Sequence, residues 1–198
     1  MTDRLHAQDY PIAETCPENV LGSRGKPLDS LTLDAVMDGS IGMEDLRITS
    51  RALLQQAQIA KYKSMVDEMG AQPGDHVLEI GCGWGGFAEY AAKERGLKVT
   101  GLTISEEQYK YAVERIEKAG LSDKVDFRLQ DYRDEDGLYD GIASIEMFEA
   151  VGEQYWPIYF ETVRNRLKPG KNATLQIITV ADRRWDIYKR GPDFIQKY

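Results

Sequence analysis

The chain has 198 residues, 42% of them hydrophobic and 29% charged, which suits one ordinary globular domain or one domain with an appendage. A formal net charge of −8 argues against nucleic-acid binding, and no apolar run approaches the roughly 20 residues that cross a bilayer. Two cysteines and two histidines, far apart, give no disulfide framework and no metal site, and the polar N-terminus is not a secretory signal, so a cytoplasmic protein is expected.

The N-terminal third differs in pattern from the rest. Turn-forming residues crowd positions 1–30, so little regular structure is expected there. Residues 31–39 are predicted as a short helix, and residues 50–69 as a longer helix that ends before Gly70. The expected apolar stripe of the longer helix consists of Leu53, Leu54, Ala57, Ala60, Met65 and Met69.

From residue 71 on, apolar strands alternate with amphipathic helices, which predicts a parallel sheet with helices on both faces. One of these helices is expected to begin at the N-cap Ser105, with Gln108 at the spacing of a capping box. The predicted strands are residues 76–81, 97–104, 124–131, 139–146 and 172–180. The predicted helices between them are residues 85–94, 105–120 and 153–167.

The stretch "LEIGCGWGG" has the form of a nucleotide-binding turn between a strand and a helix. An NAD-binding protein carries an acidic residue about 20 positions further on to hold the ribose, but Thr103 stands there. Glu79, directly before the glycines, instead suits S-adenosylmethionine, whose amino-acid end carries an ammonium group. Glycines let the backbone approach such a ligand closely; the alternative is that they only form a tight turn.

Five stretches together resemble the cyclopropane-fatty-acyl-phospholipid synthase family, a branch of the class I S-adenosylmethionine-dependent methyltransferases. They are "VLEIGCGWGGFA", "VTGLTISEEQ", "LQDYRD", "SIEMFEAVGEQYWPIYFETVRNRLKPG" and "DFIQKY". The resemblance covers residues 61–198 and implies a Rossmann-like α/β sheet with helices on both faces. Because the family continues beyond "FIQKY", the resemblance also implies a sheet that is truncated at its C-terminal side.

The resemblance implies a cofactor site built from four parts of the sheet. The first turn holds the methionine part of S-adenosylmethionine, "LTISEEQ" holds the ribose and "LQDYRD" holds the adenine. The capping-box role remains the alternative for Gln108. The implied cofactor-binding residues are Glu79, Gly81, Cys82, Gly83, Thr103, Ile104, Gln108, Asp131, Tyr132 and Ile145.

In the family, a methyl group adds to the double bond of an unsaturated acyl chain, and a base then removes a proton as the ring closes. The resemblance implies a bicarbonate as that base, held partly by Glu149, the implied catalytic residue. Glu146 lies three residues earlier and is expected to share a helical face with it; the alternative is that both only favour a helix start. The implied partners are unsaturated phospholipid acyl chains, which place the protein at a membrane surface.

The chain departs from the family pattern at positions that bear on catalysis. Gln176 stands where many members have a histidine, Lys171 replaces a second glycine, and nothing ahead of the first strand matches the family's acyl-pocket segment. We therefore expect cofactor binding with little or no turnover. The unpaired edge of a truncated sheet also predicts self-association.

Residues 9–60 resemble the start of the small subunit of adenosylcobalamin-dependent diol and glycerol dehydratases, through "DYP", "GKPL", "LTLDAV" and "EDLRIT". Two family segments thus join within "QQAQIAKY". The predicted division is a loop-rich and helical N-terminal arm, residues 1–60, and a methyltransferase core, residues 61–198. The alternatives to a methyltransferase are an interaction protein whose arm docks onto dehydratase-like subunits, and an NAD-binding oxidoreductase, which Thr103 disfavours.

Overall fold

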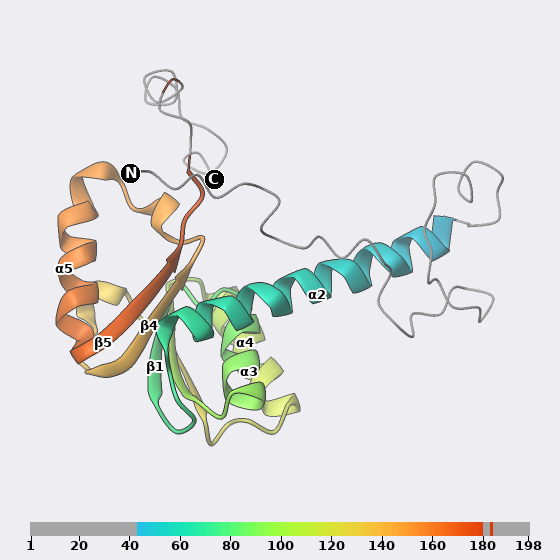
Figure 1. The fold of residues 1–198 in the computed structure, drawn as a ribbon, viewed down its shortest axis with the longest axis horizontal. Coiled ribbons are helices and arrows are strands. Elements are labelled where there is room, and N and C mark those ends of the chain that lie inside the picture. The colour runs from blue at the N-terminus through green and yellow to red at the C-terminus, as the bar shows by residue number, and fades with distance from the viewer. Residues whose placement is uncertain (1–42, 180–182, 184–198) are drawn as a thin grey trace. The chain divides into compact units, whose positions relative to one another are not determined.

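The computed structural model describes residues 43–179 and residue 183, with side chains described from residue 54 on (Figure 1). The chain divides into two compact units, Met1–Ala60 and Lys61–Tyr198. The predicted short helix at 31–39 lies outside the described residues. Within the described part, none of the helices combines the length and the apolar character needed to span a bilayer.

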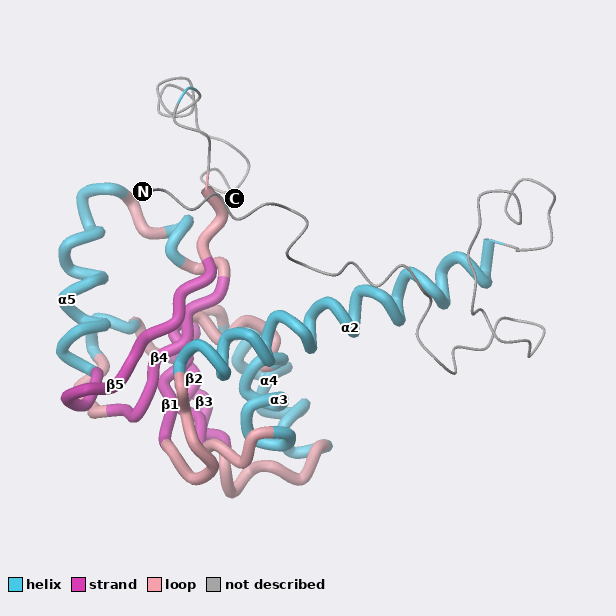
Figure 2. Tube along the Cα trace, in the orientation of Figure 1, coloured by secondary structure: helices cyan, strands magenta, loops and turns pink. Residues whose placement is uncertain are grey.

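Five parallel strands form one sheet in the order β3-β2-β1-β4-β5 (Figure 2). The chain runs outward from β1 through β2 to β3 and then continues on the other side of β1 with β4 and β5. The strand order therefore reverses between β1 and β4. The strands are β1 (His76–Ile80), β2 (Lys98–Thr103), β3 (Val125–Leu129), β4 (Tyr139–Ile145) and β5 (Leu167–Gln176).

Helices cover both faces of this sheet, which confirms the predicted α/β fold: α3 and α4 lie against one face and α5 against the other (Figure 1). The α-helices are α2 (Met43–Met69), α3 (Gly86–Glu94), α4 (Glu106–Lys118) and α5 (Trp156–Arg166). Three short 3-10 turns follow the ends of β3 and β4, namely η2 (Tyr132–Asp134), η3 (Phe148–Ala150) and η4 (Glu153–Tyr155).

Alternate residues of each strand supply two cores, one on each face, as the two-residue period of a strand requires. On β1, Val77 packs into the core under α3 and α4, whereas Leu78 and Ile80 pack into the core under α5. The first core also contains Met65, Val66, Ala91, Val99, Ile116 and Phe127. The second also contains Leu102, Tyr139, Ile142, Tyr159 and Val163.

The helix predicted to begin near residue 50 begins at Met43. Its predicted stripe is only partly buried, because Met65 and Met69 lie in the first core whereas Leu54, Ala57 and Ala60 are exposed. The buried residues belong to the unit that starts at Lys61, and the exposed ones to the unit that ends at Ala60. The apolar side chains of a helix are buried only where another part of the protein packs against them. The helix's own sequence does not show where that happens.

The end of α2 and the start of β5 were both predicted from the sequence. Gly70 ends α2 as predicted, with φ at +71° and its N–H donating to the carbonyls of Val66 and Asp67. Strand β5, predicted to begin after "KPG", begins at Leu167 instead. Its register against β4 shifts between Leu167 and Asn172, so the extra residues bulge within the strand.

Candidate functional site

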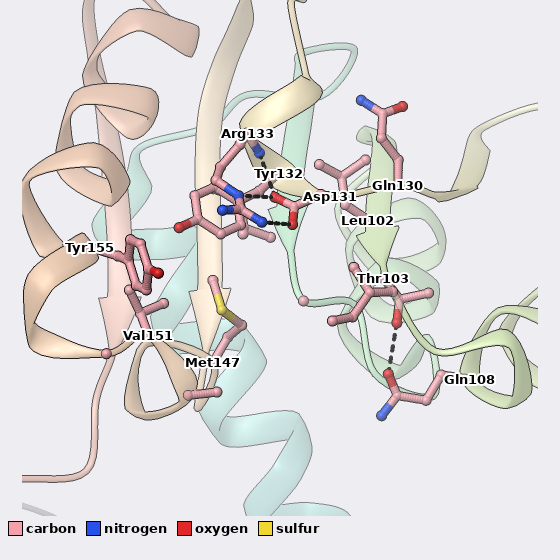
Figure 3. A pocket seen from close by; sticks show the side chains of 15 residues that line it. Leu102, Thr103, Gln108, Gln130, Asp131, Tyr132, Arg133, Met147, Val151 and Tyr155 are labelled. Atoms are coloured by element: carbon pink, nitrogen blue, oxygen red, sulfur yellow. Dashed lines mark hydrogen bonds and ion pairs between the residues drawn. The ribbon is translucent and has the colours of Figure 1, made fainter. Parts of the chain in front are cut away.

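A cavity of about 480 Å³ lies at the carboxyl ends of the strands, beside the reversal of strand order between β1 and β4. Parallel α/β sheets bind their ligands at this place, because the loops on either side of the reversal diverge and leave a crevice. Figure 3 shows polar side chains after β2 and β3 on one side of the cavity and apolar side chains after β4 on the other.

Six of the ten predicted cofactor-binding residues line this cavity. They are Gly81, Thr103, Ile104, Gln108, Asp131 and Tyr132. The other four lie outside the lining. Glu79 and Cys82 are buried within the first core, Ile145 packs against that core, and Gly83 lies in the turn.

The β1–α3 turn brings the backbone to the edge of the cavity. The N–H groups of Gly81 and Cys82 both donate to the carbonyl oxygen of Leu102, at 3.1 and 2.8 Å, so the turn is fixed to the end of β2. Gly81 and Gly83 have φ values of +81° and +50°, which glycine adopts without strain. A Cβ atom at Gly81 would lie 2.6 Å from Cγ of Met147, so the segment after β4 closes directly over this glycine.

Glu79 is a buried carboxyl group directly behind this turn. It is 3% exposed, and its Oε2 atom has no hydrogen-bond partner among the described residues. Burial raises the pKa of Glu79 well above its ordinary value, because desolvation disfavours the carboxylate. A buried cation or hydrogen-bond donor would satisfy this group.

Tyr62 of α2 is a residue that the sequence analysis missed near the same turn. A Cβ atom at Gly86 would lie 2.6 Å from its hydroxyl oxygen, so the phenol covers the first residue of α3. Burial raises the pKa of Tyr62, and the nearby Glu79 raises it further. An aromatic residue on a helix that precedes the first strand carries no distinctive spacing, so the sequence alone gave no signal for it.

The loop after β2 organises Thr103 and Gln108 as one unit. The Thr103 hydroxyl donates to Oε1 of Gln108 at 2.8 Å, and the backbone N–H of Ser105 donates to the Thr103 hydroxyl at 3.1 Å. Ser105 caps α4 as predicted by accepting from the N–H of Gln108 at 3.3 Å. The expected return bond of the capping box is absent, because Thr103 already accepts the N–H of Ser105.

Gln108 is therefore available to a ligand. Its amide oxygen is held by Thr103, and its amide nitrogen makes no bond that involves the described residues. Thr103 therefore fixes the orientation of the Gln108 amide, whose N–H groups are hydrogen-bond donors available to a ligand in the cavity (Figure 3).

The segment after β3 contributes a carboxylate that an arginine holds in place. Arg133 donates from Nε to Oδ1 of Asp131 at 2.9 Å and from Nη2 to Oδ2 at 2.7 Å. This hydrogen bonding lowers the pKa of Asp131, which is therefore ionised at neutral pH. Arg133 lines the cavity but was not predicted, since "LQDYRD" was interpreted through Asp131 and Tyr132 alone.

The apolar wall comes from the segment between β4 and α5, and the sequence analysis missed it as well. It consists of Met147, Ala150, Val151, Gly152 and Tyr155. The motif "MFEAVG" was interpreted through its glutamate, although its apolar residues are the ones that reach the cavity.

Glu149 lies outside the cavity lining, and Glu146 does not share a helical face with it. Glu149 belongs to η3, where its Oε1 atom accepts the N–H of Ile178 and its Oε2 atom is buried without a partner among the described residues. Glu146 precedes η3 with φ at +52°, so the two carboxylates do not continue one helix. The Glu146 carboxylate accepts from Lys61 at 3.4 Å and from Gln176 at 3.1 Å.

The bicarbonate that the family resemblance implies stays a prediction. The buried atoms that lack partners among the described residues, Oε2 of Glu149 and Oε1 of Gln176, are hydrogen-bond acceptors, so either could accept the O–H of a bicarbonate. Lys61 already pairs with the neighbouring Glu146. No group of three or more residues able to hold a metal ion occurs in the part of the chain that the structure describes.

Comparison with known proteins identifies matches to two families. The family model described as mycolic acid cyclopropane synthetase matches residues 43–198. The family model described as dehydratase small subunit matches residues 5–70. The two matches overlap in α2, where the sequence analysis located the join.

Among curated relatives, the tuberculostearic acid methyltransferase UfaA1 of Mycobacterium tuberculosis is 41% identical over 145 residues, which cover 73% of this chain and 34% of the relative. The cyclopropane-fatty-acyl-phospholipid synthase of Escherichia coli is 47% identical over 116 residues, which cover 59% of this chain and 29% of the relative. The chain thus spans about a third of the length of these curated relatives.

Solved structures show the same fold. The mycolic acid cyclopropane synthase CmaA1, in complex with SAH and CTAB, matches with a TM-score of 0.61 and 28% identity, covering 70% of this chain and 48% of that one. The cyclopropane synthase MmaA2 from Mycobacterium tuberculosis matches with a TM-score of 0.64 and 29% identity, covering 70% and 49%.

Proposed function

This chain belongs to the mycolic acid cyclopropane synthetase family, and we propose that it is the S-adenosylmethionine-binding core of a methyltransferase that acts on unsaturated lipid acyl chains. The observation that carries the proposal is the cavity at the reversal of strand order, which combines a glycine turn, a fixed Thr103–Gln108 pair and an ionised Asp131. When bound, S-adenosylmethionine supplies an electrophilic methyl group.

We assign the parts of the cofactor to the residues whose chemistry matches each part. Gln108 donates from its amide to the ribose, and its orientation is kept by Thr103. Asp131 accepts from the exocyclic amine of the adenine through Oδ2, which accepts one bond from Arg133, whereas Oδ1 already accepts two. Glu79, which burial keeps protonated in the free chain, loses its proton when the ligand binds and then balances the ammonium group from behind the turn.

The apolar wall supports an acyl substrate. A methyl transfer to an alkene needs a surface that excludes water from the reacting carbon atoms. Met147, Val151 and Tyr155 provide such a surface on the side of the cavity opposite Gln108 (Figure 3). Such a substrate lies in a membrane, so we place the protein at the membrane surface as a peripheral protein on the cytoplasmic side.

We assign Glu149 as the group that removes the proton. Its Oε1 atom is held by Ile178, and its Oε2 atom remains free to accept. Because Glu149 does not line the cavity, we expect the rate of transfer to be low.

The test is transfer of an isotopically labelled methyl group from S-adenosylmethionine to phospholipid vesicles, followed by mass spectrometry. Label is expected in vesicles of unsaturated phospholipid and not in vesicles of saturated phospholipid, and Glu149→Gln is expected to abolish it. Equal labelling of both kinds of vesicle would refute the proposed substrate. Binding of NAD in place of the cofactor would refute the proposed class of enzyme.

A second candidate function rests on the match of residues 5–70 to the dehydratase small subunit. In this alternative the N-terminal segment docks onto dehydratase-like subunits, and the methyltransferase fold only accompanies it. Titration calorimetry of the chain against a purified dehydratase large subunit tests this interpretation. Association that is lost when residues 1–42 are deleted would support it, and no detectable heat would exclude it.

A further inference from the structure

The buried carboxylate of Glu135 lies outside the cavity lining and accepts four hydrogen bonds. Its side chain is 1% exposed. Oε1 accepts from the backbone N–H of Gly137 at 2.9 Å and from the hydroxyl of Tyr139 at 2.8 Å. Oε2 accepts from Nη1 of Arg128 at 3.1 Å and from Nε2 of Gln130 at 3.3 Å. Four bonds fill the acceptor capacity of a carboxylate, so Glu135 acts on other parts of the protein and not on a ligand.

The four donors come from both ends of one connection. Arg128 belongs to β3 and Tyr139 begins β4, and residues 130–138 connect the two strands. One carboxylate therefore joins the start of this 130–138 connection to its end. The same connection carries four consecutive residues of the cavity lining, namely Gln130, Asp131, Tyr132 and Arg133 (Figure 3).

The backbone of the 130–138 connection packs directly on the carboxylate. A Cβ atom at Gly137 would lie 2.8 Å from Oε1 of Glu135 and 2.9 Å from the hydroxyl oxygen of Tyr139. Only glycine allows so close an approach. Glu135 also ends η2, the turn that Asp131 caps at its start, and its N–H donates to the carbonyl of Tyr132 at 3.4 Å. The place of Asp131 in the cavity therefore depends on where Glu135 is held.

The charge of Glu135 is what these four donors require. Burial by itself raises the pKa of Glu135, whereas the bonds from Gly137 and Tyr139 and the positive charge of Arg128 lower it, and the net pKa lies below the ordinary value. The group is therefore ionised at neutral pH. An amide of the same size could not replace it, because the amide nitrogen would bring its own hydrogens toward two of the four donors.

We propose that Glu135 is a positioning residue for the adenine part of the cavity. It holds the 130–138 connection in the conformation in which Asp131 meets the exocyclic amine of the ligand. It thereby sets the preference of the cavity for adenine over a purine that carries an oxygen in place of that amine. The assignment of adenine to Asp131 rests on the proposed function, whereas the holding of the connection does not.

The first measurement needs no ligand. Amide hydrogen exchange of the whole chain compares the unaltered protein with Glu135→Gln and with Tyr139→Phe, which removes one donor and no charge. Exchange within residues 130–138 is expected to rise by about tenfold in Glu135→Gln, because the amide loses at least two of the four bonds. A smaller rise in the same residues is expected in Tyr139→Phe.

Asp140→Asn is the matched control, because Asp140 directly follows Tyr139 and bonds other elements. Its carboxylate accepts from the backbone N–H of His76 at 3.1 Å and from Nζ of Lys168 at 2.8 Å, at the amino end of the strands. This variant is expected to lower Tm and to leave exchange within residues 130–138 unchanged. Unchanged exchange in Glu135→Gln, or an equal rise in Asp140→Asn, would overturn the proposal.

The second measurement is a ratio of affinities from titration calorimetry. Its ligands are S-adenosylhomocysteine and S-inosylhomocysteine, which carries an oxygen in place of the exocyclic amine. The unaltered chain is expected to bind the first about tenfold more tightly or better. In Glu135→Gln this ratio is expected to fall to within about threefold, whereas a merely structural loss would weaken both ligands equally. Asp140→Asn is expected to keep the ratio.

The two measurements separate this proposal from the proposed function. If the unaltered chain binds no S-adenosylhomocysteine, the proposed function falls and the preference for adenine falls with it, while raised exchange in Glu135→Gln would still support the held connection. If the chain binds S-adenosylhomocysteine and Glu135→Gln keeps the ratio, the positioning role is overturned and the proposed function stands.

Discussion

Thr103→Val removes one hydroxyl from the end of β2 while preserving the shape of the side chain. Thr103 is 6% exposed, so no bulk water replaces its bonds. The substitution deletes the bond to Gln108 at 2.8 Å and the bond from the Ser105 N–H at 3.1 Å. At about 0.5–1.5 kcal/mol for each bond, the free energy of unfolding should fall by about 1–3 kcal/mol. For a chain of this size that corresponds to a loss of roughly 3–10 °C in Tm.

The substitution should also weaken cofactor binding, because Gln108 loses the bond that fixes its amide. Losing one oriented hydrogen bond to the ribose should cost about tenfold in affinity for S-adenosylhomocysteine, measured by titration calorimetry. Thr100→Val is the matched control: Thr100 lies on the same strand, is 1% exposed, and bonds His76 at 2.9 Å away from the cavity. It should lower Tm without lowering affinity. Unchanged affinity in Thr103→Val, or equal losses of affinity in both variants, would refute the reasoning.

Three further predictions follow from the same site and sheet. Gly83→Val should abolish binding of S-adenosylhomocysteine in calorimetry, and it should also lower Tm, because a β-branched residue is strained at a φ of +50° even though its Cβ atom would meet no protein atom within 4 Å. Burial raises the pKa of Glu79 above its ordinary value of 4.5, so the native chain keeps a proton that the unfolded chain loses. The free energy of unfolding, from urea titrations, should therefore fall as pH rises from 4.5 towards the raised pKa, and Glu79→Gln should remove that slope. Strand β5 ends the sheet among the described residues, so light scattering should show self-association; a monomer with a sharp unfolding transition at high temperature would contradict this.

Much of the fold followed from local patterns. The strands are short apolar runs next to turn residues, and the helices carry apolar residues at helical spacing, so the alternation predicted a parallel sheet that the structure confirms. Ser105 was predictable as an N-cap because its side chain bonds within its own turn. The start of α2 at Met43 and the bulge in β5 were not predicted, and the bulge depends on how β5 pairs with β4.

The residues of the site also separate into those that were predicted from the sequence and those that were missed. The family resemblance implied that Gly81, Thr103 and Asp131 contact one cofactor, and all three line one cavity in the structure. Arg133 and Tyr62 were missed because their roles depend on a side chain reaching a partner in three dimensions. The Thr103–Gln108 hydrogen bond, which takes the place of the capping-box bond, was missed for the same reason, since it depends on the Thr103 side chain and not on residue spacing.

The proposed function depends most directly on which adenosine-containing ligand the cavity binds. Titration calorimetry of the purified chain against S-adenosylhomocysteine and against NAD, each at the same concentration and salt, measures this. We expect saturable binding of S-adenosylhomocysteine at about one per chain, with no heat from NAD beyond dilution. Binding of NAD without binding of S-adenosylhomocysteine would contradict it.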